Sequence, residues 1–425
     1  AEDGIRDCLL SRGLGDVYKR QLVILSNVDR NSFSHSNKKL GIEFDAVYTA
    51  EDIGTYKPNP NNFNYMTNNL RKTFNIKIDE ILHIAQSMHH DLVEAKNHGL
   101  DTAWIEAVLA GEVLARDLIN TPANYLGPSE LEKSTRELAH EFNAKFEVIT
   151  GEELIEKNFP MIHAVGAASG NIPKLIDLKI GSSGPKLTLV GKGVCFDTGG
   201  LNIKPGNSMG LMKKDMGGAA NVLALARAIM GLDIDLQLRV LIPAVENSIA
   251  GNAFRPGDII NSRKGLSVEI NNTDAEGRLI LADALSYASE DDPHLIISMA
   301  TLTGAARIAL GADLAPFYAG LDSDATAISE ASVAAMDPVW RMPFWDPYDK
   351  LIEPQIADLD NAPAGGFAGS ITAALFLRRF VKNPEKYIHF DIYSWQQNSS
   401  VLGPKGGLTQ GSRAILMALD KLLSI

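Results

Sequence analysis

The residues of this chain best suited to chemistry lie in a polar octet at positions 272–279, Asn-Thr-Asp-Ala-Glu-Gly-Arg-Leu. Asp274 and Glu276 place two carboxylates two positions apart, and Arg278 follows after two more. Apolar spacing predicts a strand before the octet and a helix after it. Strand-to-helix turns of this kind hold ligands at the strand ends of α/β sheets. The octet therefore indicates a cation site with an anion clamp beside it. The alternative is a solvated turn whose carboxylates only cap a helix.

A second charged stretch, upstream of the octet, favours the cation site. An apolar strand ends there in Gly-Lys-Gly at residues 191–193, and further charged residues follow. No histidine occurs between Leu187 and Ala288, and the single cysteine in that range, Cys195, has apolar neighbours. A metal here must therefore be held by oxygen atoms, with a lysine nitrogen as the one unusual option. The candidate residues of this stretch are Lys192, Asp197, Lys204 and Asp215.

In residue type and in spacing, the two stretches together resemble the leucyl aminopeptidase family of two-metal exopeptidases, whose signature is the octet. The resemblance runs from near Ala107 to Ile425, about three quarters of the chain. It implies a metal-dependent aminopeptidase that releases the amino-terminal residue of peptides. It also implies a homo-oligomer, with the hexamer as the usual assembly of the family.

The resemblance assigns one divalent metal to Lys192, Asp197, Asp215 and Glu276, and a second to Asp197, Asp274 and Glu276. Charge supports such an assignment, because four carboxylates at one place need cations to neutralise them. Two ions, Mn²⁺ or Zn²⁺, that share a carboxylate would lie roughly 3.5–4 Å apart and activate a water for attack on the peptide carbonyl. An amine binds a metal only when it is neutral, so the pKa of Lys192 would have to fall well below about 10.4.

The resemblance also implies roles for residues that do not bind the metals. Lys204 would stabilise the oxyanion of the tetrahedral intermediate, and Arg278 would hold a bicarbonate ion that relays a proton. Met212, Thr301 and Gly304 match positions that line the pocket for the first side chain. For two of them a structural role is the alternative: Met212 as a core residue at a helix end, and Thr301 as a strand-end cap.

The strand expected at residues 388–392 continues as Tyr-Ser-Trp-Gln, where leucine-preferring members carry smaller or apolar residues. These side chains should narrow or polarise the pocket, so we do not expect a strict preference for leucine.

The elements that must position these residues alternate between helix and strand. This alternation predicts an α/β fold with a mixed, largely parallel sheet flanked by helices. The expected helices span residues 107–119, 129–142, 151–156, 217–230, 280–288, 371–381 and 412–423, with Ala-rich helical pieces at 305–310 and 331–336. The expected strands span residues 146–149, 187–190, 236–244, 266–270, 295–300 and 388–392.

The first quarter of the chain differs from the rest. Residues 1–21 show no helix or strand period and are interpreted as a non-native leader. Residues 22–106, with apolar strands expected at residues 22–25 and 81–85, resemble a truncated haloacid dehalogenase-like fragment, a partial doubly wound α/β unit. In that resemblance Ser26 binds an anionic group, Lys57 stabilises charge and Asp91 belongs to the acidic end of the site. The nucleophilic Asp of that family has no counterpart here, so a joined reading frame is favoured over a natural fusion.

A metal site at His89 and His90 is disfavoured, because adjacent helical side chains point about 100° apart.

Composition narrows the functional classes. The chain has 425 residues, 45% hydrophobic and 22% charged, which suits two or three domains with ample cores. Its net charge of −12 argues against nucleic acid as the main partner. Two cysteines and no long apolar run favour a reducing cytoplasm over secretion or a membrane. The alternatives to an aminopeptidase are a non-catalytic binding or regulatory protein on the same scaffold and a dehalogenase-like hydrolase.

Overall fold

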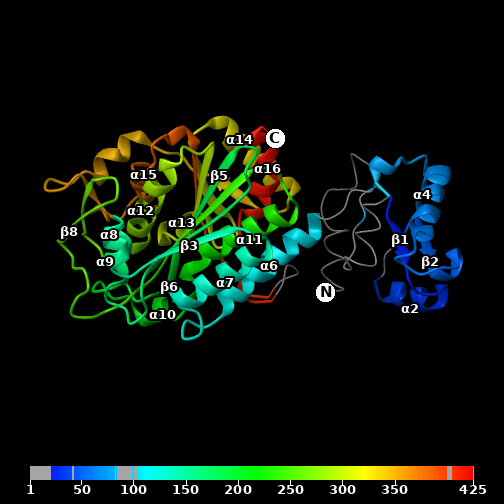
Figure 1. The fold of residues 1–425 in the computed structure, drawn as a ribbon, viewed down its shortest axis with the longest axis horizontal. Coiled ribbons are helices and arrows are strands. Elements are labelled where there is room, and N and C mark those ends of the chain that lie inside the picture. The colour runs from blue at the N-terminus through cyan, green and yellow to red at the C-terminus, as the bar shows by residue number, and fades with distance from the viewer. Residues whose placement is uncertain are drawn as a thin grey trace. The chain divides into compact units, whose positions relative to one another are not determined.

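The computed structural model describes residues 21–40, 43–81, 83, 98–99, 104–399 and 404–424. The chain divides into two compact units, which are described separately below (Figure 1). The smaller unit comprises Ala1–Ala107 with Asn398–Lys405, and the larger comprises Val108–Gln397 with Gly406–Ile425.

The smaller unit contains a parallel pair of strands, β1 (Val23–Ser26) and β2 (Ala46–Thr49). Phe63, Met66 and Leu70 of one helix form its core and pack against apolar residues of both strands. The apolar run that predicts a strand at residues 22–25 therefore corresponds to β1. The strand expected at residues 81–85 lies largely outside the described residues. The helical segments of this unit are α2 (Arg30–Leu40), α3 (Ala50–Ile53), α4 (Pro60–Phe74) and the 3-10 turn η1 (Ile78–Glu80).

The larger unit is built on a nine-stranded sheet of order β12-β11-β14-β10-β5-β7-β4-β3, with β6 paired to β7. Five neighbouring pairs are parallel, whereas β11–β14, β7–β4 and β4–β3 are antiparallel. The predicted mixed, largely parallel sheet is therefore confirmed. Its strands are β3 (Lys145–Thr150), β4 (Lys174–Ile180), β5 (Lys186–Gly191), β6 (Gly193–Asp197), β7 (Gln237–Asn247), β10 (Leu295–Ala300), β11 (Ala315–Ala319), β12 (Val339–Arg341) and β14 (Tyr387–Asp391).

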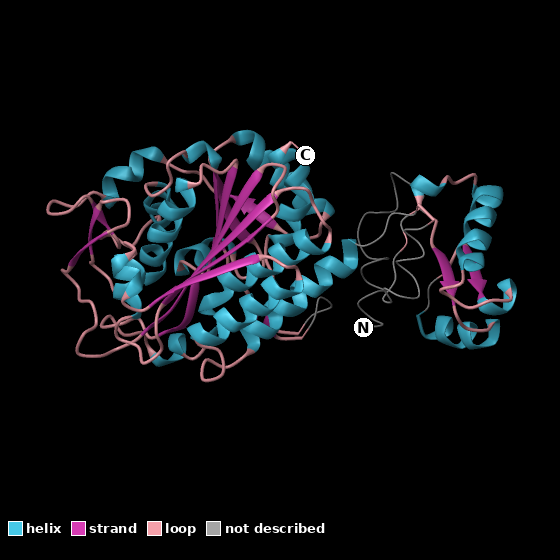
Figure 2. Cartoon of the chain, viewed as in Figure 1, coloured by secondary structure: helices cyan, strands magenta, loops and turns pink. Residues whose placement is uncertain are grey.

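Helices cover both faces of this sheet (Figure 2). Two of them, α11 and α12, are buried on almost every side; α11 is largely apolar, whereas α12 also buries the charged residues Glu276, Arg278 and Asp283. Among the described helices none is long and apolar enough to cross a membrane. The helices are α6 (Trp104–Asn120), α7 (Pro128–Glu141), α8 (Glu153–Glu156), α9 (Pro160–Gly166), α10 (Gly206–Met209), α11 (Gly217–Gly231), α12 (Glu276–Glu290), α13 (Gly304–Leu310), α14 (Asp322–Ala334), α15 (Gly369–Arg378) and α16 (Ser412–Leu423), with 3-10 turns η3 (Met212–Met216), η4 (Asp346–Ile352) and η5 (Pro384–Lys386).

Two small sheets complete the unit. One of them contains the strand expected at residues 266–270, which does not belong to the central sheet. The strand expected at residues 266–270 forms as β9 (Ser267–Glu269), but it pairs with β8 (Ile259–Asn261) and β13 (Leu359–Asp360) outside the central sheet. The physical reason is local, because a tight turn with Gly265 at φ 86° folds β9 back on β8. The other small sheet joins β15 (Trp395–Gln396) to β16 (Gly406–Gly407).

The octet is also more helical than its sequence indicates. Helix α12 begins at Glu276 rather than near Ile280, so the second half of the octet forms the first turn of a buried helix. The helix fixes the backbone of both Glu276 and Arg278. Because they are two positions apart, their side chains leave the helix in different directions.

Candidate metal centre

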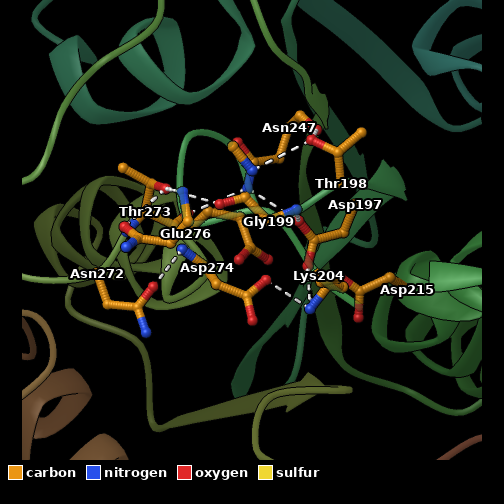
Figure 3. A network of polar contacts seen from close by, with 12 residues as sticks. Asp197, Thr198, Gly199, Lys204, Asp215, Asn247, Asn272, Thr273, Asp274 and Glu276 are labelled. Atoms are coloured by element: carbon orange, nitrogen blue, oxygen red, sulfur yellow. Dashed lines mark hydrogen bonds and ion pairs between the residues drawn. The ribbon is translucent and has the colours of Figure 1, made fainter. Parts of the chain in front are cut away.

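Three buried carboxylates from distant parts of the chain meet at the carboxyl ends of the inner strands of the central sheet. Asp197 ends β6, Asp215 lies in η3, and Glu276 opens α12. One oxygen atom from each lies within 4.8 Å of the others. Figure 3 shows Asp274 joining this group from the turn before α12. The structure thus brings together the four predicted carboxylates.

Lys192 enters this cluster from a break between two strands. Strands β5 and β6 pair one after the other with the same strand, β7, and Lys192 is the residue between them. Its amide nitrogen donates to the Met299 carbonyl (3.0 Å), and its own carbonyl accepts from Ala219 (2.9 Å). The backbone is therefore fixed to β10 and α11, and the buried side chain points into the cluster.

The side chain of Lys192 crosses the first turn of α12. A Cβ atom on Gly277 would lie only 2.6 Å from its Cε and 2.8 Å from its Nζ. Glycine at position 277 therefore leaves the space that the lysine occupies.

The Lys192 ammonium contacts two of the carboxylates. Its Nζ lies 2.8 Å from Asp215 Oδ2 and 2.8 Å from Glu276 Oε1, and it donates to the Thr301 carbonyl (3.1 Å). Burial lowers the pKa of Lys192, but the neighbouring carboxylates outweigh burial and hold this pKa above its ordinary value. The fall of this pKa that metal ligation requires therefore depends on added positive charge beside the amine.

Lys204 contacts the other two carboxylates. Its Nζ lies 2.9 Å from Asp197 Oδ2 and 2.5 Å from Asp274 Oδ1. Burial lowers the pKa of Lys204 and these carboxylates raise it, with a net rise. The lysine predicted to stabilise an oxyanion thus lies at the cluster, next to residues predicted to bind metal.

The cluster carries more negative than positive charge. Four carboxylates face two ammonium groups, an excess of two negative charges. Burial, and then the charge of Asp197, raise the pKa of Glu276 to about 8 and that of Asp274 to about 6. Asp215 Oδ2 and Glu276 Oε1 each contact the Lys192 ammonium, Asp274 Oδ1 contacts that of Lys204, and none of these oxygens has another donor in the described part of the chain. Carboxylate oxygens that outnumber the cations around them are the ligands that divalent cations require.

A polar frame holds the loop after β6 against the octet. Asp197 Oδ1 accepts from the Asn247 side chain and from the Gly199 amide, each at 2.8 Å. The Thr273 hydroxyl donates to the Gly199 carbonyl (2.6 Å), and Thr273 and Asn202 exchange two further bonds of 2.8 Å. These bonds orient one oxygen of Asp197 toward the cluster.

Neither Asn247 nor Asn202 is among the site residues predicted from the sequence. Asn247 could have been found from its place at the end of the apolar strand β7, where its neighbour β6 ends in Asp197. Asn202 carries no comparable signal, because its partner Thr273 lies 71 positions away.

Arg278 is buried two residues into α12. Among the described residues its Nε and Nη1 atoms have no hydrogen-bond partner. Burial lowers the pKa of Arg278 to about 10, against the opposing effects of Asp391 and Glu276. A buried guanidinium with free donors can bind an anion, which fits the predicted bicarbonate.

The three residues predicted to line a pocket differ in their surroundings. The Thr301 hydroxyl donates to Asp215 Oδ1 (2.7 Å), so this residue orients a carboxylate of the cluster. Gly304 is exposed at the first position of α13, and Met212 is half-buried at the start of η3. Their contact with a substrate side chain stays a prediction.

A sequence model of the cytosol aminopeptidase family, catalytic domain, matches residues 113–416. The chain belongs to the cytosol aminopeptidase family. It is 43% identical over 316 residues to the probable cytosol aminopeptidase of Syntrophotalea carbinolica, covering 73% of this chain and 63% of that protein. It is 42% identical over 328 residues to the cytosol aminopeptidase of Encephalitozoon cuniculi, covering 75% and 68%.

Among solved structures, the chain is similar to the cytosol aminopeptidase from Coxiella burnetii, with 37% identity and a TM-score of 0.74. That comparison covers 96% of this chain and 98% of the other. By contrast, the chain spans 63% of the length of the Syntrophotalea relative. Membership of the cytosol aminopeptidase family therefore concerns the catalytic domain.

The predicted dehalogenase-like fragment gains no support from these comparisons, since the family match begins at residue 113. Ser26 is the last residue of β1, and Leu25 precedes it. The Lys57 ammonium donates to the Leu25 carbonyl (3.0 Å), so Lys57 lies close to Ser26. Asp91, His89 and His90 lie outside the described residues.

Proposed function

We propose that this chain is a two-metal-dependent aminopeptidase that hydrolyses the amino-terminal residue from peptides. The observation that carries the proposal is the buried cluster of Asp197, Asp215 and Glu276, in which one oxygen of each carboxylate lies within 4.8 Å of the others. Membership of the cytosol aminopeptidase family supports the same function.

In this proposal the cluster holds two divalent cations, Mn²⁺ or Zn²⁺. When bound, such cations lower the pKa of a water to near neutrality and polarise the peptide carbonyl. One ion would be held by Lys192, Asp197, Asp215 and Glu276, and the other by Asp197, Asp274 and Glu276. Asn247 and Thr301 support this arrangement, because each bonds one oxygen of Asp197 or Asp215, and the second oxygen of each carboxylate faces a lysine of the cluster.

Two basic residues would act on the reacting groups. Lys204 is partly open to solvent, with 14% of its side chain exposed, and its ammonium can donate to the oxyanion of the tetrahedral intermediate. Arg278 would hold a bicarbonate ion that accepts the proton of the attacking water. Met212, Thr301 and Gly304 would contact the first side chain of the peptide.

The proposal extends to the setting of the enzyme. We place it in the cytoplasm as a homo-oligomer, the hexamer in particular, acting on peptides and not on nucleic acid or membranes. The net charge of −12 supports the exclusion of nucleic acid.

Metal analysis combined with hydrolysis of a leucine anilide tests the proposal. We expect close to two divalent ions per chain after loading, turnover that a chelator abolishes, and recovery on adding Mn²⁺ or Zn²⁺. A fully loaded chain that hydrolyses no amino-terminal amide or anilide would instead favour a binding role for the same scaffold.

A further inference from the structure

Tyr393 and two cationic side chains that lie over its ring form a stack beside the candidate metal centre. The Lys214 ammonium lies 4.8 Å from the centre of its ring, and the Arg307 guanidinium also lies 4.8 Å from it. Lys214 is buried in η3, whereas Arg307 is exposed on α13. The ring is half-buried, so the stack extends from the interior of the protein to its surface.

Two separate connections place this stack next to the carboxylate cluster. Lys214 directly precedes Asp215 in the chain. On the other side, the Thr301 hydroxyl bonds to Asp215, and α13 begins three residues later at Gly304.

Arg307 follows Gly304 by one helical turn and folds back over it. A Cβ atom on Gly304 would lie 3.7 Å from Arg307 Nη2. The guanidinium therefore covers a position predicted to face the substrate's first side chain.

Neither cation of the stack is neutralised by the described part of the chain. Lys192 and Lys204 each have carboxylates within 2.9 Å, but no described carboxylate lies within ion-pair distance of Arg307 or Lys214. The nearby Asp391 is already committed, since it accepts from two backbone amides and from the Thr303 and Ser370 hydroxyls. An accessible guanidinium that lies over an aromatic ring is well suited to bind a carboxylate with two parallel hydrogen bonds.

We propose that Arg307, stacked on Tyr393, binds the carboxylate of an acidic first side chain, so that this enzyme favours peptides that begin with glutamate or aspartate. The inference rests on the proposed aminopeptidase function and names its substrate class. Lys214 adds a second positive charge next to the Tyr393 ring. These polar surroundings disfavour a leucine as the first side chain of the substrate.

The test compares amides of glutamate, glutamine and leucine as substrates of the full, metal-loaded chain. Glutamine has the shape of glutamate without its charge, and amides carry no terminal carboxylate. We expect kcat/KM for the glutamate amide to exceed that for the glutamine amide by about tenfold or more, the range expected for charge-assisted hydrogen bonds. Arg307→Met should abolish this ratio, and Arg307→Lys should restore part of it.

The matched control is Arg255→Met, because Arg255 is an exposed arginine paired with Asp258 (3.4 Å) and has no place in the site. This variant should keep the wild-type ratio. An equal rate for glutamate and glutamine amides in the wild type would overturn the inference, as would an unchanged ratio in Arg307→Met.

A second comparison separates the side-chain carboxylate from the terminal carboxylate of a dipeptide. If Arg307→Met slows Leu-Gly but not Leu-glycinamide, and leaves the ratio of glutamate to glutamine amides unchanged, the guanidinium binds the peptide terminus and the inference is wrong.

Calorimetric binding of free glutamate and glutamine distinguishes failure of the inference from failure of the proposed function. If no amide is hydrolysed, the aminopeptidase proposal fails. Selective binding of glutamate that is lost in Arg307→Met would still support the acidic subsite, and equal binding of both amino acids would refute it.

Discussion

At the scale of single residues, the site is governed by an imbalance of charge. Lys192 and Lys204 each contact two carboxylates, yet the cluster keeps an excess of two negative charges. The two lysines are not equivalent, because Lys192 is 3% exposed and Lys204 lies at the more open edge of the cluster. Removal of Lys204 should therefore affect chemistry more than it affects metal binding.

We predict that Lys204→Ala keeps metal content near two ions per chain while kcat falls by roughly 10²–10³, the usual cost of losing an oxyanion donor. Metal analysis by mass spectrometry and steady-state kinetics on the same preparation check this. Unchanged kcat in a fully loaded variant would remove Lys204 from the mechanism.

Proton and metal compete for the same carboxylates, which predicts a pH dependence. The pKa of Glu276 is about 8 and that of Asp274 about 6, both above their ordinary values of 4.5 and 3.8. Metals bind the ionised forms, so metal affinity should rise as pH increases from 6 to 8, by up to about tenfold per pH unit for each proton released.

The same shifts set the sign of the stability change without metal. An acid whose pKa is raised by folding contributes stability below its ordinary pKa, and this stability is lost as pH rises toward the folded pKa. The melting temperature of the chelated protein should therefore fall between pH 5 and 8, and the loaded protein should resist this fall. Calorimetric titration and thermal unfolding test both statements, and a metal affinity independent of pH would contradict them.

At the scale of the elements, close backbone contacts decide where the charged side chains can lie. Gly277 is the clearest case, because Lys192 crosses α12 at the place where a side chain would otherwise project. A glycine inside a helix normally costs stability relative to alanine, so packing and not helix propensity explains it here.

We predict that Gly277→Ala loses at least about tenfold in kcat/KM as Lys192 is displaced. Its stability should also fall, because crowding the buried lysine away from Asp215 and Glu276 costs more than the gain of at most about 1 kcal/mol in helix propensity. Urea unfolding and kinetics with metal content measure the two effects. Gly170→Ala is the control, because nothing lies within 4 Å of its added Cβ.

Asp283 joins three elements within the core. It is buried in α12 and accepts hydrogen bonds from the amides of Met161 (2.8 Å), Ile162 (3.4 Å) and Arg263 (2.8 Å). These bonds fix the first turn of α9 and the turn before β9 to the helix that carries Glu276.

Asp283→Ala should lower the free energy of unfolding by roughly 3 kcal/mol, because it leaves buried amides without an acceptor. Asp322→Ala, at an exposed ion pair with Arg341, should change it by less than about 0.5 kcal/mol. Denaturant titration of both variants checks the contrast, and similar values for the two would show that Asp283 is not a structural tie.

At the scale of the whole molecule, every residue of the proposed site lies in the larger unit. The smaller unit brings Ser26 and Lys57 together, but a dehalogenase-like reaction needs an Asp nucleophile that forms a covalent ester. In that family this Asp follows an earlier strand, and the sequence of residues 1–20 shows no strand pattern. The first part of the chain is therefore expected to contribute no chemistry.

We predict that a chain beginning at Ala107 retains metal binding and aminopeptidase turnover, and that the full chain shows no hydrolysis of 2-haloacids or phosphate esters. Parallel assays of both chains check this. Turnover of either substrate class by the full chain, abolished by Asp91→Ala, would show that the smaller unit is an active hydrolase.

Part of the site could be predicted from the sequence because it depends on local spacing. Asp274, Glu276 and Arg278 within the octet indicated a cation site, and the alternation of helix and strand indicated the sheet that positions it. Short-range geometry of this kind is encoded within single elements, so it can be read without knowing the tertiary structure. The individual metal ligands were assigned by the resemblance to the leucyl aminopeptidase family.

Tertiary structure alone decided what depends on packing between distant segments. It placed β9 outside the central sheet, tied Asp197 to Asn247 across 50 positions, and folded Arg307 onto Tyr393. It also determined that the carboxylates around Lys192 raise the pKa of this lysine more than burial lowers it. Burial, unpaired charge and close contact arise only when segments far apart in the chain pack together, and local periodicity carries no information about them.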